Sequence, residues 1–193
     1  ILFIRRVIWK FILHLSMSGM NSENHLKEQE EKFAKQLLDA GLQEMKHHLY
    51  PTDKNFIYDG LNRDGLLRCY RTFYNDDKSD ICSIITFGER MCGHRGILHG
   101  GASASVLDQF FGLMMCLLDI QGFTGQLQLS YRKIILCPST VLIRGSFLKE
   151  EGRKHYFKAV ITDEVGDICV EAECLFIQSD VKKILDRALN KLQ

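Results

Sequence analysis

The chain has 193 residues, which is enough for one domain with terminal extensions. Its 25 lysine and arginine side chains nearly balance 24 aspartate and glutamate side chains, so no overall field attracts nucleic acid, and no nucleic acid partner is expected. An anionic ligand must therefore be held by local groups. The seven cysteines contain no C-x-x-C pair, which predicts buried thiols in a reducing compartment rather than a disulfide scaffold.

Residues 1–21 form a basic segment without acidic side chains. Its cations are separated by apolar residues, a pattern typical of a mitochondrial presequence. A second interpretation is equally open, in which Met17 or Met20 is the true start and the upstream residues are a translated leader. The apolar runs are too short to span a bilayer, so no transmembrane segment is predicted. The predicted location is mitochondrial or cytoplasmic.

Residues 22–55 are predicted to form an N-terminal helical extension. The segment from Ser22 to about Tyr50 is charged, contains no proline and carries an apolar stripe at helical spacing, which we expect to pack on the main domain. His47 and His48 are adjacent and point about 100° apart on a helix, so they do not form a metal-binding pair. The stripe consists of Leu26, Phe33, Leu37, Leu38 and Leu42.

Residues 56–178 are predicted to form the main domain. Segments rich in Ile, Val, Tyr, Phe and Thr surround one long apolar helix and are separated by polar turns. This order indicates an α+β domain with a curved antiparallel sheet. Apolar spacing in 179–193 predicts a short C-terminal helix. The predicted strands are 66–74, 80–87, 126–131, 141–148, 155–162 and 168–177, and the turn-rich stretches are 58–63 and 89–96.

The stretch from His99 to Asp119, HGGASASVLDQFFGLMMCLLD, is the centre of the chain. Two glycines after the histidine predict a sharp turn with uncovered backbone N–H groups, and the apolar run 102–118 predicts a helix buried on nearly all faces. Such a helix start favours anions. Asp108 lies within the run, where burial would raise the pKa of its carboxyl group toward the range of a general base. Asp108 is therefore the leading catalytic candidate.

The spacing between Gly101 and Asp108 points to two subunits. Seven residues of helix span about 10 Å along the axis, which is too far for one carbonyl group to reach both the glycine N–H and the carboxylate. If both act on one group, the helix must lie beside an antiparallel copy of itself in a two-fold dimer with two equivalent sites.

The chain carries Gly96-Ile-Leu-His-Gly-Gly-Ala, an aspartate nine residues after that histidine, and then Thr124-Gly-Gln-Leu-Gln-Leu-Ser-Tyr-Arg-Lys. In this order the motifs resemble the hotdog-fold acyl-CoA thioesterases of the PaaI type, closest to the animal thioesterase superfamily members that act on long-chain acyl-CoA. Glu151-Gly-Arg-Lys and Glu171-Ala-Glu-Cys-Leu-Phe-Ile resemble the closing strands of that family. The resemblance covers roughly residues 65–178.

The resemblance implies a hotdog fold, in which a curved antiparallel sheet wraps around the long buried helix, here with extra N- and C-terminal helices. It implies hydrolysis of a medium- to long-chain fatty acyl-CoA to free acid and CoA by a homodimer with interface active sites, or by a dimer of dimers. Gly100 and Gly101 would stabilise the oxyanion, and Asp108 of the other subunit would be the general base or nucleophile. No cofactor is expected, because CoA is part of the substrate. The related animal enzymes include mitochondrial ones.

Thr124 and His99 are the next candidates. Thr124 can hydrogen-bond the carboxylate or the attacking water and matches a threonine or serine of relatives, although a turn residue at a strand start is the alternative. His99 is expected to orient the glycine turn through a ring hydrogen bond rather than to transfer protons.

Gly93 departs from the family pattern, because many relatives carry Asn or Gln six residues before the histidine to polarise the carbonyl group. His94 is the alternative donor; without it the oxyanion site has a different shape. CoA phosphates also need cations, although charged strand ends are commonly just solvated. The basic residues expected near the phosphates are Arg132, Lys133, Arg153 and Lys154.

Other chemistries have less support in the sequence. Cys92, His94 and His99 lack a fourth ligand at zinc spacing, so no metal site is predicted. Ser103 and Ser105 follow no G-x-S-x-G elbow and are expected to pack against the partner helix. A hotdog hydratase or dehydratase is a second enzymatic hypothesis, but the helix lacks an Asp-x-x-x-x-His pattern.

A non-catalytic acyl-CoA-binding module is a third hypothesis, motivated by Gly93 and by the terminal helices.

Asp119 is expected to be a solvated, structural residue at the helix end. Four large side chains of the helix either line an acyl tunnel or fill the core, namely Phe110, Phe111, Met114 and Met115.

Overall fold

The computed structural model describes residues 19–46 and 54–190. Residues 1–18 and the adjacent His47 and His48 lie outside the described residues, so the interpretations of a targeting segment and of a surface histidine pair stay predictions. The predicted boundaries between extensions and main domain also stay predictions.

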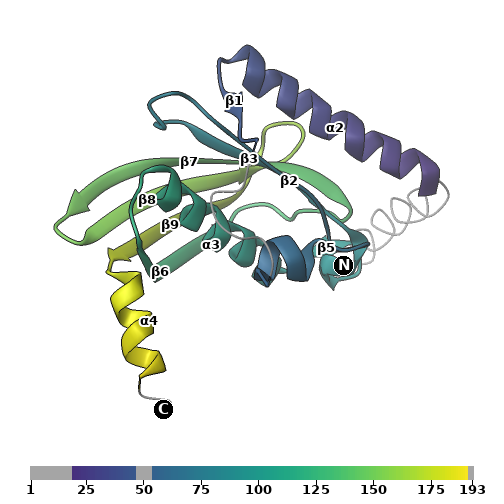
Figure 1. The fold of residues 1–193 in the computed structure, drawn as a ribbon. Helices are drawn as coiled ribbons and strands as arrows, with labels where there is room; N and C mark the ends of the chain where they lie inside the picture. The colour runs from purple at the N-terminus through teal and green to yellow at the C-terminus, as the bar shows by residue number, and fades with distance from the viewer. Residues whose placement is uncertain (1–18, 47–53, 191–193) are drawn as a thin grey trace.

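Seven antiparallel strands form one curved sheet, in the order β1-β2-β3-β7-β8-β9-β6. The sheet wraps around helix α3, Gly100–Leu117, as expected from the sequence (Figure 1). A short ribbon of β4 and β5 precedes α3. The strands are β1 Gln43–Glu44, β2 Leu67–Tyr74, β3 Ile81–Phe87, β4 Cys92–His94, β5 Ile97–Leu98, β6 Gly122–Tyr131, β7 Ser139–Glu151, β8 Lys154–Thr162 and β9 Ile168–Gln178.

The six strands predicted from the sequence are all present, each within four residues of its expected bounds. The prediction missed β1, β4 and β5, which are two or three residues long and so carry no readable alternation. The stretch expected to be turn-rich holds a π-helical turn, Phe56–Leu61, whose first N–H groups are capped by the side chain of Asn55.

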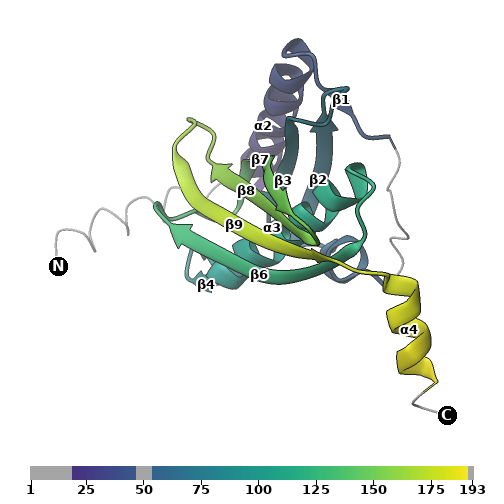
Figure 2. The same ribbon diagram turned by 90° about the vertical axis from the view of Figure 1, so that its left-hand side faces the viewer.

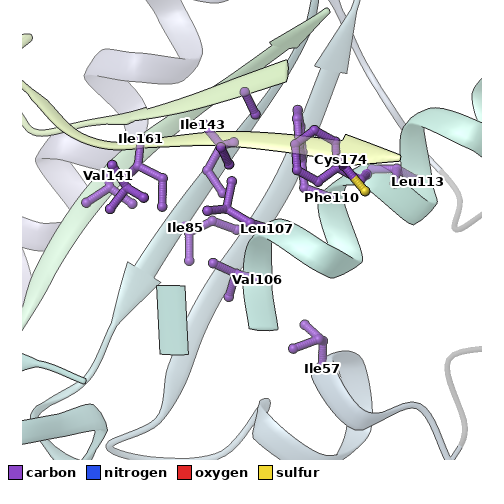
Figure 3. Close-up of a cluster of buried hydrophobic side chains, with 14 of the residues drawn as sticks. Ile57, Ile85, Val106, Leu107, Phe110, Leu113, Val141, Ile143, Ile161 and Cys174 are labelled. Carbon is purple, nitrogen blue, oxygen red and sulfur yellow. The ribbon is translucent and has the colours of Figure 1, made fainter. Parts of the chain in front are cut away.

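The main core lies between α3 and the inner face of the sheet (Figure 3). Leu107 and Phe110 of α3 are fully buried against side chains such as Ile85 and Ile143. Burying one side chain of this size stabilises the fold by about 1.5–3 kcal/mol. Gly145 of β7 permits the close approach, because a Cβ atom there would overlap the Phe110 ring. The position of α3 is therefore fixed by packing.

Phe111 and Met114 are also at most 1% exposed, so these two side chains and Phe110 fill the core and do not line a tunnel. Met115 is the fourth large side chain for which the sequence left open an acyl tunnel or the core. It is the one of the four that also lines a surface groove.

Helix α2, Gly19–Asp39, covers the opposite face of the sheet (Figures 1 and 2). Its side chains Phe33 and Leu37 pack in a second core cluster with Phe73 of β2. Because α3 and α2 cover the two faces, every residue of β3 is buried. Leu38, which the sequence places in the apolar stripe, is instead 50% exposed.

The N-terminal extension is shorter as a helix than the sequence predicts. Helix α2 ends at Asp39 rather than near Tyr50, because the chain turns at Gly41, where φ is +87°. Leu42 stays buried in the second cluster, and the chain continues as β1 along the sheet edge.

An ion-pair network joins β2 to β1 and to helix α2. The Arg71 guanidinium donates from Nε to Glu44 Oε1 at 2.7 Å and from Nη1 to Glu31 Oε1 at 2.8 Å. The hydrogen bond from Arg71 lowers the pKa of Glu44 below its ordinary value. This contact fastens the short strand β1 to the sheet edge.

Helix α3 differs from its prediction on one face. Gly101, Asp108 and Cys116 are exposed, and Ser105 and Gly112 between them are half-buried. These positions repeat every three or four residues, so they form one stripe along the helix. The expectation of a buried Asp108 is wrong for the single chain, because the sheet covers α3 from one side only.

Helix α4, Val181–Leu189, follows β9 and points away from the sheet (Figures 1 and 2). The predicted C-terminal helix is therefore present. The side chain of Ile184 on it is 42% exposed, which shows that this residue does not join the core.

Candidate active site

His99 caps the N-terminus of α3. Its ring nitrogen Nδ1 accepts the N–H of Gly101 at 2.9 Å, and its carbonyl oxygen accepts the N–H of Ala102 at 2.9 Å. The His99 N–H donates to the carbonyl oxygen of Met91 at 2.9 Å, which fixes the turn to the preceding loop. The ring hydrogen bond predicted for His99 is therefore present, and Nδ1 must be the unprotonated ring nitrogen.

The glycine N–H groups at this turn are not equivalent. Both glycines are expected from the sequence to stabilise the oxyanion, but the Gly101 N–H is occupied by His99 Nδ1. The Gly100 N–H donates to no acceptor within the part of the chain that the structure describes. It lies at the first residue of α3, where the helix dipole favours negative charge. The available donor is therefore Gly100.

Asp108 and Thr124 are brought together from different elements. Thr124, near the start of β6, donates its hydroxyl to Asp108 Oδ1 at 2.8 Å. Both side chains are exposed, so the second carboxylate oxygen faces solvent. The hydrogen bond expected from the sequence is present, and it orients the carboxylate at the surface of α3.

A groove of about 1010 Å³ opens beside Asp108. Its floor follows the exposed stripe of α3 past Gly112 and Cys116, and a Cβ atom added at Gly112 would meet nothing within 4 Å. Phe123 of β6 and Phe176 of β9 contribute apolar surface, and α4 contributes Val181, Lys182 and Asp186. The carboxylate therefore lies beside a groove whose lining is apolar along α3 and β9 and also includes polar side chains, namely Asn55, Gln109, Gln121, Lys182 and Asp186.

Gly100 faces a different hollow. Its volume is about 280 Å³, and it lies between the start of α3 and the end of β6. Asp108 is not among its lining residues, and Gly100 does not line the groove beside Asp108. The separation inferred from the helical spacing is therefore observed in the single chain, in which the two groups do not share a site. The lining residues are Ile97, Leu98, Gly100, Ser103, Tyr131, Arg132, Lys133, Ile134, Ile135 and Val170.

Gly93 lies directly against His99. A Cβ atom at position 93 would come within 2.8 Å of His99 Cδ2 and 3.2 Å of His99 Cα. A side chain here therefore requires the histidine to shift. His94, the alternative donor, is exposed on β4 and lines neither of the two hollows. The structure thus gives a packing reason for Gly93 and does not bring His94 to the site.

Two of the four predicted phosphate-binding cations are paired with carboxylates. Arg132 Nε donates to Glu171 Oε2 at 2.7 Å. Lys133 Nζ donates to Asp163 and Asp167, and these hydrogen bonds raise the pKa of Lys133 above its ordinary value. Both cations lie beside Gly100, at the lining of the smaller hollow.

The other two cations, Arg153 and Lys154, are exposed at the turn between β7 and β8. Through the strand register, Lys154 pairs with Ile177, which pairs with Phe123 at the start of β6. These cations therefore lie at the sheet end that holds Thr124, and the four predicted cations are divided between the two ends of β6.

The remaining polar candidates have structural roles. Ser103 is 2% exposed, Ser105 Oγ donates to the Gly101 carbonyl at 2.9 Å, and Asp119 is exposed just after α3. Burial, with the charge of Asp108, raises the pKa of Cys174 to about 12, so this thiol stays protonated and is not a nucleophile.

Residues 19–46 and 54–190 contain no group of metal-ligating side chains, and no helix among them is long and apolar enough to cross a membrane.

Two residues of this region are not among the candidates predicted from the sequence. Gly112 is a glycine inside an apolar helix, where it lowers helix stability by about 1 kcal/mol relative to alanine, and this cost is the signal that could have drawn attention to a position that the structure places on the groove floor. Tyr131 was quoted only as part of a motif. Its hydroxyl donates to the Gly100 carbonyl at 2.8 Å, a contact between residues 31 positions apart that no local pattern reveals.

Residues 95–170 match the family model described as the thioesterase superfamily. The matched range contains the glycine turn, Asp108 and Thr124, and it omits α2 and α4. The resemblance stated from the motifs is confirmed by this match.

The chain is also similar to named proteins and to solved structures. The acyl-coenzyme A thioesterase THEM4 of Mus musculus is 31% identical over 123 residues, covering 63% of this chain and 53% of that protein. THEM4 of Rattus norvegicus is 34% identical over 126 residues, with the same coverage. The chain therefore spans about half the length of these relatives.

A hypothetical thioesterase of Streptococcus pneumoniae, solved with coenzyme A, has a similar structure with a TM-score of 0.56. It is 17% identical and covers 65% of this chain and 97% of its own. The likeness shows the fold, and the predicted hotdog fold is confirmed. An uncharacterised mitochondrial membrane protein of Saccharomyces cerevisiae is 26% identical over 101 residues, which is 50% of this chain and 41% of that protein.

Proposed function

We propose that this protein is an acyl-CoA thioesterase that hydrolyses a medium- to long-chain fatty acyl-CoA to the free acid and CoA. The observation that carries the proposal is the Asp108 carboxylate, held at 2.8 Å by Thr124 and exposed beside the groove along α3. The match of residues 95–170 to the thioesterase superfamily and the similarity to THEM4 support the same reaction.

The active site is formed by two copies of the chain. Because Gly100 and Asp108 face separate hollows in one chain, the carboxylate of one copy acts with the Gly100 N–H of the other. If two α3 helices lie antiparallel along their exposed stripes, Asp108 of each copy lies near Gly100 of the other. The dimer then has two equivalent sites, each made of these two half-sites. The small residues Gly101 and Ser105 on that stripe permit close approach of the helices, while Gly112 lies beyond the overlap of residues 100–108.

The edge strand β6 supports a dimer. It is ten residues long, and its outer edge pairs with no other strand of the described residues. An uncovered edge of this length is a template for pairing with a second chain. Exposed apolar side chains lie at both ends, Phe123 at the start and Tyr131, Ile134 and Leu136 at or just after the end. Antiparallel pairing would cover both groups together.

In the reaction, Asp108 takes a proton from a water molecule, whose oxygen attacks the thioester carbonyl carbon. The Gly100 N–H of the second copy stabilises the resulting oxyanion; one such donor contributes about 3 kcal/mol to lowering the barrier. The intermediate collapses by breaking the carbon–sulfur bond, and the proton on Asp108 passes to the leaving thiolate. Free acid and CoA thiol are the products.

A second route uses Asp108 as the nucleophile. Its oxygen attacks the thioester carbonyl carbon, and the CoA thiolate leaves. Water then attacks the Asp108 carbonyl carbon of the mixed anhydride, which releases the fatty acid and regenerates the carboxylate, and the proton lost by water passes to the thiolate. The two routes differ in isotope transfer. Hydrolysis in ¹⁸O-water in a single turnover labels the fatty acid in the first route, whereas the second route places the label in Asp108.

The acyl chain is proposed to lie along the groove that begins at Asp108. From there the floor passes over Gly112, Met115 and Cys116 to Ile120, all of them groove-lining residues. The distance from Asp108 to Cys116 along the helix is about 12 Å, and Ile120 continues the groove just beyond the end of α3, which suits a medium to long hydrocarbon chain. The preference for medium to long acyl chains rests on this length and on the apolar part of the lining.

The CoA phosphates are proposed to meet cations from both copies. Arg153 and Lys154 lie at the Thr124 end of β6, and Arg132 and Lys133 lie at the other end. Antiparallel strand pairing would bring one pair from each copy to the same site. Arg153 and Lys154 are the main candidates, because Arg132 and Lys133 are already paired with carboxylates.

The proposal is tested by measuring CoA release from acyl-CoA of four to eighteen carbons with a thiol-reactive chromophore, and the oligomeric state by light scattering. We expect release that rises with chain length, from a dimer or a dimer of dimers. Absence of release at every chain length contradicts the proposal, as does a fully active monomer.

A non-catalytic acyl-CoA-binding module is the second candidate, favoured by Gly93 in place of an amide side chain. Tight calorimetric binding of a long-chain acyl-CoA without CoA release would favour it. A hydratase is disfavoured, because the residue five positions after Asp108 on α3 is Leu113 and not histidine. We also propose a mitochondrial location, motivated by the basic segment 1–21 and by the name of the yeast relative, to be tested by fusing that segment to a fluorescent protein.

A further inference from the structure

The peptide group between Gly100 and Gly101 is held at both of its polar atoms. Its carbonyl oxygen accepts the hydroxyl of Tyr131 at 2.8 Å, and its N–H donates to His99 Nδ1 at 2.9 Å. The two partners come from different elements, since Tyr131 ends β6 and His99 precedes α3. Both glycines lie in the first turn of α3, and the two side-chain contacts add to the constraint that the helix backbone places on this peptide plane.

The preceding peptide group, between His99 and Gly100, carries the N–H proposed to bind the oxyanion. Its carbonyl oxygen accepts the N–H of Ala102 at 2.9 Å. With both flanking peptides fixed, the rotations about the Gly100 Cα atom are fixed as well. Two adjacent glycines weaken the conformational preference of a first helical turn, so the side-chain contacts of Tyr131 and His99 stabilise the helical arrangement of this turn.

The contact of Tyr131 with Gly100 is close. A Cβ atom at position 100 would lie 3.1 Å from the Tyr131 hydroxyl oxygen and 3.3 Å from ring atom Cζ. The Tyr131 side chain is 56% exposed, so it contributes less to the core than a buried aromatic residue. Its specific contribution to this turn is the hydroxyl, which phenylalanine lacks.

Strand β6 thus carries a hydroxyl contact to α3 at each end. Thr124 near its start holds the Asp108 carboxylate at 2.8 Å, and Tyr131 at its end holds the Gly100 carbonyl at 2.8 Å. The same edge strand therefore fixes both half-sites relative to the sheet. Thr124 orients the carboxylate, and Tyr131 has the matching role for the peptide that carries the oxyanion donor.

We infer that Tyr131 is a positioning residue, whose hydroxyl holds the Gly100–Gly101 peptide so that the Gly100 N–H points at the developing oxyanion. This inference rests on the proposed thioesterase function. Tyr131 does not touch the reacting atoms and acts through Gly100. Its loss lowers the stabilisation of the oxyanion without removing ground-state binding of acyl-CoA.

The test is Tyr131→Phe, which removes only the hydroxyl. We expect kcat to fall about 5- to 10-fold, the change expected for one lost hydrogen bond, with KM changed less than about twofold. Tyr156→Phe is the matched control, since Tyr156 donates its hydroxyl to Glu151 at 3.2 Å in the turn region of β7 and β8. The control is expected to keep wild-type kcat.

Two inhibitors separate positioning from a general structural effect. A trifluoromethyl ketone analogue of acyl-CoA forms a tetrahedral adduct that resembles the oxyanion, whereas a CoA thioether has no carbonyl group. Tyr131→Phe is expected to weaken the ketone about as much as it lowers kcat and to leave thioether binding unchanged. Equal weakening of both inhibitors would overturn the inference, as would unchanged kcat.

Amide hydrogen exchange at Gly101 gives a readout that needs no turnover. If the hydroxyl of Tyr131 holds the peptide, Tyr131→Phe accelerates exchange of the Gly101 amide, and Tyr156→Phe does not. Absence of CoA release by the wild type would refute the proposed function. The exchange rates would still show whether the Tyr131 hydroxyl holds the Gly100–Gly101 peptide. A wild type that hydrolyses acyl-CoA while Gly101 exchange is unchanged in Tyr131→Phe overturns the inference alone.

Discussion

The Thr124 hydroxyl donates to Asp108 Oδ1 at 2.8 Å and thereby joins the edge strand β6 to the exposed face of helix α3. The two residues are 16 positions apart, separated by the rest of the helix and a turn. A carboxylate on an exposed helix face would otherwise rotate among several rotamers. The hydrogen bond selects one of them and leaves Oδ2 available to a water molecule.

Replacing Thr124 tests this contact. Thr124→Ala removes the hydroxyl, and we expect kcat to fall about 10-fold, because the carboxylate loses one charge-assisted hydrogen bond. Thr124→Ser keeps a hydroxyl and should retain most of the activity. Steady-state kinetics of CoA release would measure both variants. Equal losses in the two would mean that the methyl group, and not the hydroxyl, matters at this position.

Asp108→Asn is expected to lower kcat by at least about 100-fold, because an amide cannot accept the proton from water. The side chain is exposed and nearly isosteric, so the melting temperature should stay close to that of the wild type. Asp119→Asn is the matched control, since Asp119 is also exposed and lies just after the same helix. A fully active Asp108→Asn variant would remove the central assignment.

Gly112→Leu should shift the preference for acyl chain length. A side chain at this position would rise into the groove one helical turn beyond Asp108, where an added Cβ meets nothing within 4 Å. We expect kcat/KM for a sixteen-carbon substrate to fall about 10-fold more than for a four-carbon substrate. Gly112→Ala adds only a methyl group and should have a smaller effect. A uniform loss at all chain lengths would indicate damage to the helix contact rather than to the acyl path.

The strands and the buried helix could be predicted from the sequence because their signals are local. The alternation of Gln126 to Tyr131 and the apolar run after Gly101 are determined by backbone periodicity, and the structure places a strand and a helix there. The end of α2 was harder, because the positive φ of Gly41 terminates a pattern that charged residues continue.

The candidate site was predictable in its residues but only partly in its geometry. The burial expected for Asp108 was wrong for one chain, because whether a helix face is covered depends on elements far away in sequence or on another copy. The choice between Gly100 and Gly101 as donor depends on the orientation of the His99 ring, which accepts one N–H and leaves the other. No sequence pattern encodes that orientation.

The ion pair between Glu44 and Arg71 predicts a pH-dependent contribution to stability. Because the pKa of Glu44 is lowered in the folded chain, its contribution is present above the unfolded pKa, about 4.3, and is lost as pH falls through the lowered folded value. Glu44→Gln should reduce the free energy of unfolding at pH 7 by about 0.5 kcal/mol, since the pair is partly exposed and screened. Denaturant unfolding should show the two proteins converging as the pH falls below the ordinary pKa of a glutamate; an undiminished difference in acid would contradict the assignment.

Gly93→Ala tests why this chain lacks a side chain before the glycine turn. The added methyl group would lie 2.8 Å from His99 Cδ2, and to relieve the overlap the histidine must move away from Gly101. We expect kcat to fall about 10-fold through loss of the cap and displacement of the Gly100 N–H. His94→Ala should keep nearly wild-type kcat, because His94 lines neither hollow. A large loss in His94→Ala, with Gly93→Ala unaffected, would instead assign the missing donor to His94 and make the packing explanation for Gly93 wrong.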